Sequence, residues 1–339
     1  MRYPEFLKEK GTIGLVAPSF GVSGFPYEDK FENARKTFDD LGFSFVDARH
    51  LKGIRHARST TAKIRARELQ QMYLSDECDF VESIAGGELM LEILPYLNFE
   101  KIGKAKPKWF MGISDNTTFA FTLTTICDVA SLYGPCFGSF GVRKWDRSLK
   151  EAYEMMIGKR LTQKSYKLYE LPENAKSSDD PLAGYQVSEP VVYKSLDGNP
   201  VKMKGRIIGG CMDVLLNICG TRFDKLREFT ERYKDDGIIL YLEACDLNVL
   251  DIYRGLWQLR NAGWFDNVTG LVMGRPHNGG ELFDVDVREA LINNLKGLNI
   301  PVIYDADIGH VPPSWTIING AIASVNYENG KCRIRYELR

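Results

Sequence analysis

The strongest chemical signal in the sequence is a serine that follows an apolar segment. Residues 109–113 (WFMGI) predict a buried strand, Ser114 comes next, and a helix is expected from about Asn116. This order is typical of a nucleophile elbow, in which the helix N-terminus stabilises negative charge near the serine hydroxyl. The G-x-S-x-G pattern is incomplete, because Asn116 stands where the second glycine would be. Ser114 or Asp115 would therefore serve equally well as the N-cap of the helix.

A serine nucleophile needs a base, and the chain has four histidines. His310 is the best placed, in a Gly/Pro-rich loop just after a predicted strand. His277 competes with it, because it too lies in a glycine-rich loop after a strand. His50 and His56 lie among Arg and Lys and are expected to be solvated. A three-histidine metal site would need nearly the whole supply, and serine hydrolysis requires no metal or other cofactor.

The base must be oriented by an acid, and Glu243 is the candidate. It ends the apolar run 238–243 (IILYLE), where a carboxylate needs a partner or must face a cleft. The alternative role for Glu243 is a helix cap or a salt bridge between domains.

The composition excludes several other classes of function. The 339 residues carry 45 acidic and 44 basic side chains, and 44% of them are hydrophobic. A net charge of −1 gives no simple case for binding nucleic acid or an anionic membrane. No apolar run is long enough to span a bilayer, and the N-terminus does not resemble a signal peptide. Seven scattered cysteines without a C-x-x-C pair indicate reduced thiols, so we expect a cytoplasmic protein.

The elements that must position these residues alternate between strands and helices. Strands are predicted near residues 12–16, 43–46, 80–84 and 108–113, and amphipathic helices near 27–41, 59–74 and 88–97. Such alternation predicts an N-terminal three-layer α/β/α domain with a parallel sheet. We assign it residues 1–165.

Residues 166–200 are rich in Pro, Gly, Ser and acids, and we interpret them as a connector with a loop that faces the substrate. Residues 201–339 form the second domain, which would carry the acid and the base. Strands are expected at 237–243, 268–273 and 300–304, with helices at 248–262 and 285–295 and a hairpin around Asn329-Gly330.

With Ser114, Glu243 and His310 considered together, the sequence resembles the S66 serine peptidases, the LD-carboxypeptidases that include the microcin C self-immunity hydrolases. The resemblance extends over nearly the whole chain in ordered blocks. They are IGLVAPS, SIAGGE, ILPYL, PKWFMGISDNT, YGP, GRIIGG, CGT, LYLEACD, GLWQLRNAGWFDNVTGLVMG and GHVPP. Their shared order and spacing make the match specific.

The resemblance implies that the chain has two α/β domains, the second with a mixed, partly barrel-like sheet. It also implies that two copies of the chain form a homodimer. It implies a triad with Ser114 as nucleophile, Glu243 as acid and His310 as base. The backbone N–H groups of Gly87 and Asp115 would be the oxyanion donors. This agrees with the residues themselves, because glycine lets backbone approach a ligand.

Two departures from the family pattern concern the surroundings of the triad. Ala244 follows the acid where an aspartate is common in the family, so we expect the residues that hold Glu243 in place to differ from those of the family. Glu88 follows Gly86-Gly87 and borders the expected substrate pocket, which bears on the identity of the substrate.

Three functions are considered. The first is an LD-carboxypeptidase that releases terminal D-Ala from murein tetrapeptide, whose carboxylate would need Arg206, Arg275 or Arg143. The second is an amidase that acts on microcin-like aminoacyl-nucleotide analogues, and it would need an aromatic platform for the base. The third is a non-catalytic α/β ligand-binding protein. Candidates for the platform, each of which fits ordinary packing as well, are Trp145, Tyr169, Tyr185 and Tyr193.

Overall fold

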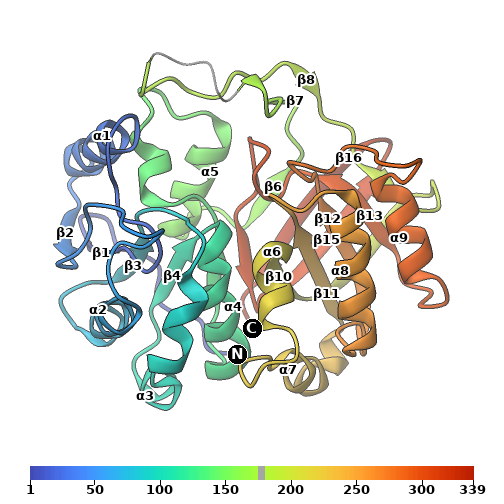
Figure 1. Cartoon of the computed structure of the whole chain (residues 1–339), viewed down its shortest axis with the longest axis horizontal. Helices are drawn as coiled ribbons and strands as arrows, with labels where there is room; N and C mark the ends of the chain where they lie inside the picture. Colours follow the sequence, from blue (N-terminus) through green and yellow to red (C-terminus); the bar gives the residue numbers. More distant parts are fainter. Residues whose placement is uncertain (175–179) are drawn as a thin grey trace.

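The computed structural model describes residues 1–174 and 180–339, which contain two β-sheets and the helices that cover them (Figure 1). The α/β fold class is confirmed: the first sheet is mostly parallel and the second is mixed. In the described part of the chain, no helix combines the length and apolar character needed to cross a membrane. All seven cysteines are free thiols.

The first sheet has six strands, and all but one of its pairings are parallel. Their spatial order is β14 (Ile317–Asn319), β5 (Ser131–Tyr133), β4 (Trp109–Gly112), β3 (Phe80–Ser83), β1 (Thr12–Val16) and β2 (Ser44–Asp47). The exception is β14, which comes from the C-terminal part of the chain and pairs antiparallel with β5. The C-terminal part therefore completes the N-terminal sheet.

Two groups of helices cover this sheet, as the alternating pattern predicts. One contains α1 (Tyr27–Asp40), α5 (Arg147–Met156) and the 3₁₀ turn Phe137–Gly141. The other contains α2 (Ala62–Leu74), α3 (Phe99–Lys104), α4 (Thr117–Cys127) and the 3₁₀ turn Met90–Tyr96. Phe38 of α1 packs against Phe137, Phe140 and Trp145, so the first group is joined by an aromatic core.

The second sheet has eight strands with a parallel centre and antiparallel flanks. Its order is β6 (Thr162–Lys164), β16 (Lys331–Glu337), β15 (Ile322–Glu328), β10 (Val201–Cys211), β11 (Ile238–Glu243), β12 (Val268–Gly274), β13 (Val302–Ala306) and β9 (Lys194–Ser195). All six residues of β11 are buried, which explains its continuous apolar run. The helices of this half are α6 (Met212–Ile218), α7 (Leu226–Arg232), α8 (Val249–Asn261) and α9 (Val287–Leu295).

The region predicted as a connector contains the small hairpin of β7 (Leu168–Tyr169) and β8 (Glu189–Pro190), followed by β9. Part of the predicted connector, residues 175–179, lies outside the described residues. The strand β6 lies before the predicted boundary at residue 165, yet it pairs with β16 of the second sheet. The division into domains at residues 165 and 200 remains a prediction.

The two halves meet near the start of α4. Thr117 opens this helix, and its Oγ1 accepts a 3.1 Å hydrogen bond from the backbone N–H of Cys211 at the end of β10. A side chain at Gly210 would come within 2.4 Å of Thr117 Cγ2, so only glycine allows this approach. The helix α4, which follows Ser114, is thereby fixed against the second sheet, in which the strand β11 ends at Glu243.

Candidate active site

Ser114 occupies a strained turn between β4 and α4. Its φ of +66° lies in the left-handed region, which costs energy for a residue with a side chain. The turn Ser114–Asn116 is a single 3₁₀ turn, and the helix begins directly after it. The Ser114 N–H donates a 3.1 Å hydrogen bond to the hydroxyl of Tyr133. This is the backbone geometry expected of a nucleophile elbow.

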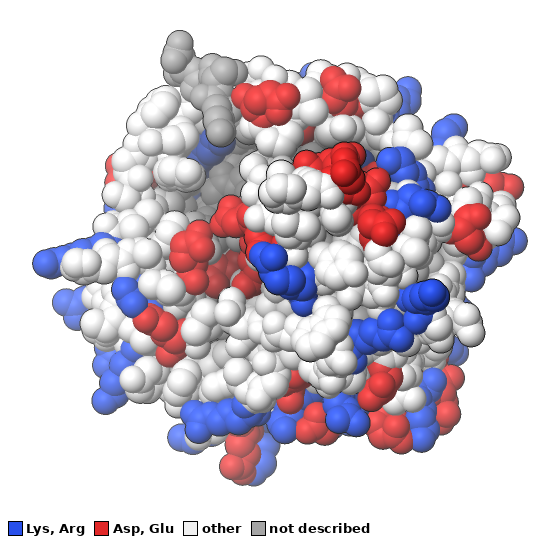
Figure 2. Space-filling model, turned by 45° about the vertical axis from the view of Figure 1, so that its right-hand side comes forward, with Lys and Arg blue, Asp and Glu red and all other residues white. Residues whose placement is uncertain are grey.

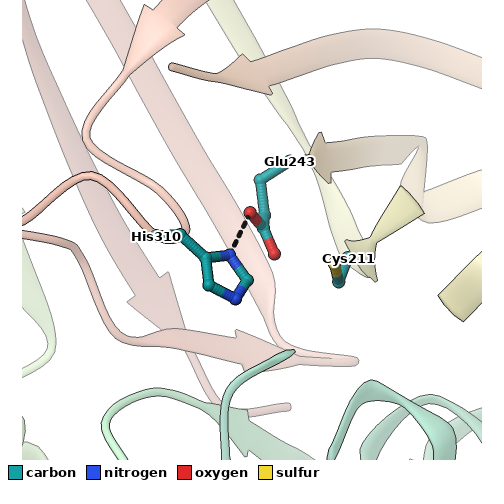
Figure 3. Close-up of side chains that lie close together, drawn as sticks. All are labelled: Cys211, Glu243 and His310. Carbon is teal, nitrogen blue, oxygen red and sulfur yellow. Dashed lines mark hydrogen bonds and ion pairs between the residues drawn. The ribbon is translucent and has the colours of Figure 1, made fainter. Parts of the chain in front are cut away.

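Glu243 is fully buried at the end of β11 and accepts hydrogen bonds on both carboxylate oxygens. The Tyr133 hydroxyl donates to Oε1 at 2.5 Å, and Nδ1 of His310 lies 2.8 Å from Oε2 (Figure 3). A proton on Nδ1 leaves Nε2 as the acceptor of the ring. Nε2 of His310 is buried and has no hydrogen-bond partner among the residues that the structure describes. The histidine thus presents the nitrogen that a general base requires.

The electrostatics of His310 depend on this pair. Burial would lower the pKa of His310, but the Glu243 carboxylate and a contact with the Cys245 thiol outweigh burial. Together they raise the pKa well above the ordinary value of 6.5. Glu243 therefore stabilises the imidazolium form that a base becomes when it takes a proton.

Glycines bring the histidine loop directly onto the acid. A side chain at Gly309, whose φ is +104°, would come within 2.3 Å of Glu243 Oε2. A side chain at Gly274, the last residue of β12, would come within 2.9 Å of Glu243 Cβ. The Glu243 side chain is consequently in close contact with the backbone at two glycines, where any side chain would collide with it.

The turn predicted to supply an oxyanion donor lies against Ser114. A Cβ added at Gly86 would be 3.2 Å from Ser114 Cβ, and one added at Gly87 (φ +148°) would be 2.2 Å from Ser19 Oγ. No hydrogen bond found in the described ranges uses the Gly87 N–H. The buried Asp115 side chain anchors the turn, because its Oδ2 accepts from Ser19 Oγ at 2.5 Å and from the Met90 N–H at 2.7 Å.

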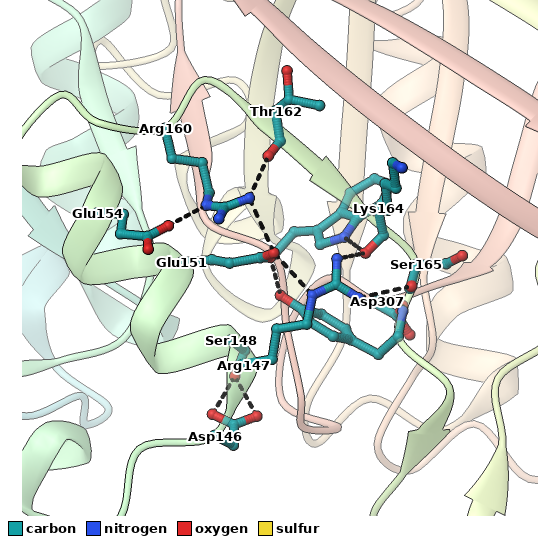
Figure 4. Close-up of polar contacts among 12 residues, drawn as sticks. Asp146, Arg147, Ser148, Glu151, Glu154, Arg160, Thr162, Lys164, Ser165 and Asp307 are labelled. Carbon is teal, nitrogen blue, oxygen red and sulfur yellow. Dashed lines mark hydrogen bonds and ion pairs between the residues drawn. The ribbon is translucent and has the colours of Figure 1, made fainter.

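A polar network supports the histidine loop from the N-terminal half (Figure 4). Asp307, three residues before His310, is fully buried and accepts from the Tyr166 N–H at 2.9 Å. The Tyr166 hydroxyl donates to Glu151 of α5 at 3.1 Å, and Arg147 also contacts Glu151 at 2.9 Å. This chain of contacts joins α5 to the segment that carries His310.

Several predicted residues lie elsewhere or have other partners. Arg206 is buried near the chain termini, where it contacts Asp236 at 2.7 Å and stacks on Tyr233, so these contacts give no support to its predicted role in substrate binding. Arg206 lies on β10, five positions before Cys211, which pairs with Glu243 of the neighbouring strand β11. His277 donates its backbone N–H to Ala244, near the acid, but His310 makes the carboxylate contact. His50, expected to be solvated, is one-third exposed (33%) and also contacts Glu68 at 2.5 Å.

The remaining arginine candidates differ in their surroundings. Arg143 forms an exposed ion pair with Asp180. Arg275 contacts Asp307 at 3.3 Å and stacks on Tyr169, and its buried Nη1 has no hydrogen-bond partner among the described residues.

Of the four candidate aromatic platforms, only Tyr185 lines the cavity beside His310, which measures about 200 Å³ and also touches Ile113. Tyr169 stacks with Arg275, Tyr193 is fully buried, and Trp145 packs in the core with Phe38.

Acidic side chains surround the predicted site. Burial and the nearby charges of Asp246, Asp115 and Asp213 raise the pKa of Glu88, whereas His310 lowers it. The space-filling view shows acidic residues beside a hollow in the surface (Figure 2). Glu88 therefore lies within electrostatic reach of His310.

Sequence reasoning missed four residues around the Glu243–His310 pair, which we call the dyad. Tyr133 appeared only within the YGP block, and its hydroxyl connects Ser114 to Glu243. Asp213 accepts hydrogen bonds from the N–H groups of residues 245–247 and so fixes the loop after the acid. The thiols of Cys211 and Cys245 lie beside Glu243 and His310. The only sequence feature that could have indicated these four residues is their position at or shortly after the end of a strand.

One group in the described part of the chain has the donors that a metal ion would need. Sγ of Cys211 and one donor atom each of Glu243 and His310 lie within 4.8 Å of one another (Figure 3). These are ligand types that Zn²⁺ accepts. An ion there would compete with the Glu243–His310 hydrogen bond.

Family models match both halves of the chain. The LD-carboxypeptidase N-terminal domain matches residues 13–134, and the LD-carboxypeptidase C-terminal domain matches residues 204–325. The microcin C7 self-immunity protein of Escherichia coli is 27% identical over 330 residues, with 94% of this chain and 91% of that protein covered. The probable murein peptide carboxypeptidase of Bacillus subtilis is 25% identical over 328 residues, with coverages of 95% and 91%.

Solved structures share the fold. The microcin C7 self-immunity protein in complex with aspartyl sulfamoyl adenosine superposes with a TM-score of 0.84 at 20% identity, with 99% of each chain covered. A similar protein from Bacillus anthracis gives a TM-score of 0.83 at 23% identity, over 99% of this chain and 100% of that one.

Proposed function

Because this chain belongs to the S66 family of LD-carboxypeptidases and is therefore a hydrolase, we propose that it cleaves an amide bond by covalent serine catalysis. Ser114 is the nucleophile, His310 the base and Glu243 the acid that orients the base. The observation that carries the proposal is the set of hydrogen bonds linking the Ser114 backbone, Tyr133, Glu243 and His310. A helix cap would explain Ser114 alone, but it would not explain a buried acid–histidine pair tied to the same turn.

In the proposed mechanism, Nε2 of His310 takes the hydroxyl proton of Ser114 as Oγ attacks the carbonyl carbon of the substrate. The N–H groups of Gly87 and Asp115 stabilise the tetrahedral oxyanion. His310 then gives its proton to the leaving amine, and the amide C–N bond breaks. Water, activated by His310, hydrolyses the acyl-enzyme and restores Ser114.

We propose a peptide with a terminal D-Ala as the substrate, as in murein tetrapeptide. One support is the acidic surroundings of Glu88, whose pKa is affected by the charges of Asp246, Asp213 and His310. That charge favours a substrate with an ammonium group, which both a murein peptide and an aminoacyl-nucleotide analogue carry, so the size of the cavity decides between them. The cavity of about 200 Å³ next to His310 is suited to a small leaving residue rather than a nucleoside.

The second candidate is an amidase for aminoacyl-nucleotide analogues. It is favoured by the fold shared with a protein solved with aspartyl sulfamoyl adenosine and by the position of Tyr185 in the cavity wall. Tyr185 would be the platform for the base in that case.

The two candidates can be separated by one comparison. The wild-type protein is incubated with a murein tetrapeptide and with an aminoacyl sulfamoyl adenosine, and released alanine and cleaved nucleoside are quantified. A serine-directed fluorophosphonate, followed by mass spectrometry of the labelled peptide, reports the nucleophile. We expect alanine release and a label on Ser114, and no label or turnover in Ser114→Ala. Turnover of both substrates by Ser114→Ala at the wild-type rate would refute serine catalysis.

A further inference from the structure

Asn116 is a fully buried amide that bridges two segments of the site. Its Nδ2 donates to the carbonyl oxygen of Ala85 and to that of Ile113, both at 3.0 Å. Ala85 directly precedes the Gly86-Gly87 turn, and Ile113 directly precedes Ser114. One side chain therefore holds the turn of the proposed oxyanion donor and the turn of the proposed nucleophile at a fixed separation.

The Asn116 side chain is itself held tightly in place. A Cβ added at Gly112, the last residue of β4, would come within 2.7 Å of both Asn116 Cβ and Asn116 Cγ. The Nδ2 also lies 3.5 Å from the Sγ of the buried Cys136. The amide is packed on the strand that leads into the elbow, so it cannot turn away without disturbing that strand.

The other end of the Asn116 amide is unsatisfied. Its Oδ1 is buried and has no hydrogen-bond partner in the described ranges, and the same holds for both carboxylate oxygens of Glu82. Glu82 lies on β3, three residues before Ala85, and is fully buried. Burial raises the pKa of the Cys136 thiol, the charge of Glu82 raises it further, and a hydrogen bond from Asn116 lowers it. The three side chains therefore belong to one buried cluster.

A buried carboxyl group without a cationic partner takes up a proton. Burial alone raises the pKa of Glu82 well above its ordinary value, in agreement with this expectation. A neutral carboxyl group is a hydrogen-bond donor, and an amide oxygen is an acceptor. The cluster thus contains a donor without an acceptor and an acceptor without a donor.

We propose that Asn116 is a positioning residue that holds the Gly87 N–H in place opposite Ser114, and that the Glu82 carboxyl group donates a hydrogen bond to Asn116 Oδ1 to fix the orientation of the amide. The proposal rests on the proposed serine mechanism, because it assigns Asn116 to the alignment of its oxyanion hole. Asn116 acts through the backbone and does not touch the substrate.

The first test compares Asn116→Ala with a matched control. Loss of one oxyanion donor costs about 100- to 1,000-fold in kcat, so misalignment of one should cost roughly 10- to 100-fold. We expect this loss in kcat with KM changed less than about threefold, and an equal loss of affinity for a peptide boronic acid that mimics the tetrahedral intermediate. Asn294→Ala is the control, because Asn294 is a buried asparagine that donates to a backbone carbonyl within α9. It should leave kcat and boronate affinity unchanged.

The second test separates a donor from mere packing at position 82. Glu82→Gln keeps a donor and should retain the wild-type kcat and boronate affinity. Glu82→Met keeps the volume without a donor, and it should lower kcat and boronate affinity in the same direction as Asn116→Ala. Thermal melts of all variants show whether each one folds.

The outcomes distinguish this inference from the function on which it rests. Normal kcat and boronate affinity in Asn116→Ala, with an inactive Ser114→Ala, would overturn the positioning role and leave serine catalysis standing. If Glu82→Met matched Glu82→Gln, the assigned hydrogen bond would be wrong. If Ser114→Ala retained activity, the proposed function itself would fail.

Discussion

The hydroxyl of Tyr133 donates a 2.5 Å hydrogen bond to Oε1 of Glu243 and thereby connects the end of β5 in one sheet to the end of β11 in the other. The same hydroxyl accepts the N–H of Ser114. Position 133 therefore determines how the elbow lies relative to the acid. The parallel strands of both sheets end at this place, as is usual for sites in open α/β sheets.

Tyr133→Phe removes this connection without changing the shape of the side chain much. Two partners, the buried Glu243 carboxylate and the partly buried Ser114 N–H, would each lose a hydrogen bond, at a cost of about 1–3 kcal/mol for the buried one and less for the other. We expect a drop in the free energy of unfolding, measured with urea, and a reduced kcat. Tyr336→Phe is the control, since its buried hydroxyl donates to the Thr316 carbonyl. A wild-type kcat in Tyr133→Phe would show that the elbow keeps its place without this bond.

Gly309→Ala should disturb the acid by direct contact. The added Cβ would lie 2.3 Å from Glu243 Oε2, in a backbone conformation with φ +104°. Gly53 has a similar φ of +93° with open space around it, so Gly53→Ala isolates the cost of the backbone conformation. Both variants should lose about 1 kcal/mol or more of stability. Only Gly309→Ala should lose kcat, and equal activity in the two would contradict the packing of Gly309 on Glu243.

The pH dependence of kcat/KM should report His310. The base works when neutral, and Glu243 raises the pKa of His310 against the effect of burial. Activity should therefore rise with pH along a limb that lies above 6.5, the ordinary histidine pKa. In Glu243→Gln the charge is gone and burial prevails, so the remaining activity should have its acid limb at lower pH. An unchanged limb in Glu243→Gln would exclude Glu243 as the cause of the shift.

The same shift affects stability. A histidine whose pKa is raised in the folded state stabilises the fold most at pH values below its unfolded pKa, and the contribution is lost as pH rises through the folded pKa. In Ser114→Ala, which keeps the pair, the urea midpoint should contain a component that falls with rising pH above about 6.5. His310→Gln should lack that component.

Zinc should inhibit the enzyme at the dyad. Cys211, Glu243 and His310 offer donors within 4.8 Å of one another, and an ion bound there would remove His310 from its hydrogen bond. We expect inhibition of the wild-type protein that EDTA reverses, and weaker inhibition of Cys211→Ser. Cys219→Ser is the control, because Cys219 lies at the C-terminal end of α6. Inhibition of Cys211→Ser at the same zinc concentration would mean that the ion binds elsewhere.

The sequence was most informative where a polar residue follows an apolar run. Ser114 and Glu243 follow or end buried strands, and His310 follows β13 in a glycine-rich loop, so all three could be predicted from local pattern and resemblance. The alternation of strands and helices likewise predicted the parallel sheet, because a helix between two strands returns the chain for parallel pairing and covers a face of the sheet.

Other features depend on contacts between distant segments. A basic residue on a strand gives no sign of whether its partner is a substrate or a carboxylate, so the contact of Arg206 with Asp236 could not be predicted. Asn116 was noted only as a missing glycine, although its amide bridges two carbonyls. The pairing of β14 with β5 joins residues more than 180 positions apart, and short strands of three residues have no periodicity to detect.

This pairing has a consequence for biosynthesis. The edge of the first sheet is completed by Ile317–Asn319, which follow His310 and are synthesised after Ser114 and Glu243. Until then β5, which carries Tyr133, has an unpaired edge, and the base loop has no anchor in the N-terminal sheet. A nascent chain that already contains Ser114 and Glu243 therefore lacks the strand that joins the His310 loop to the first sheet, so the site can be assembled only after residues 317–319 have been synthesised.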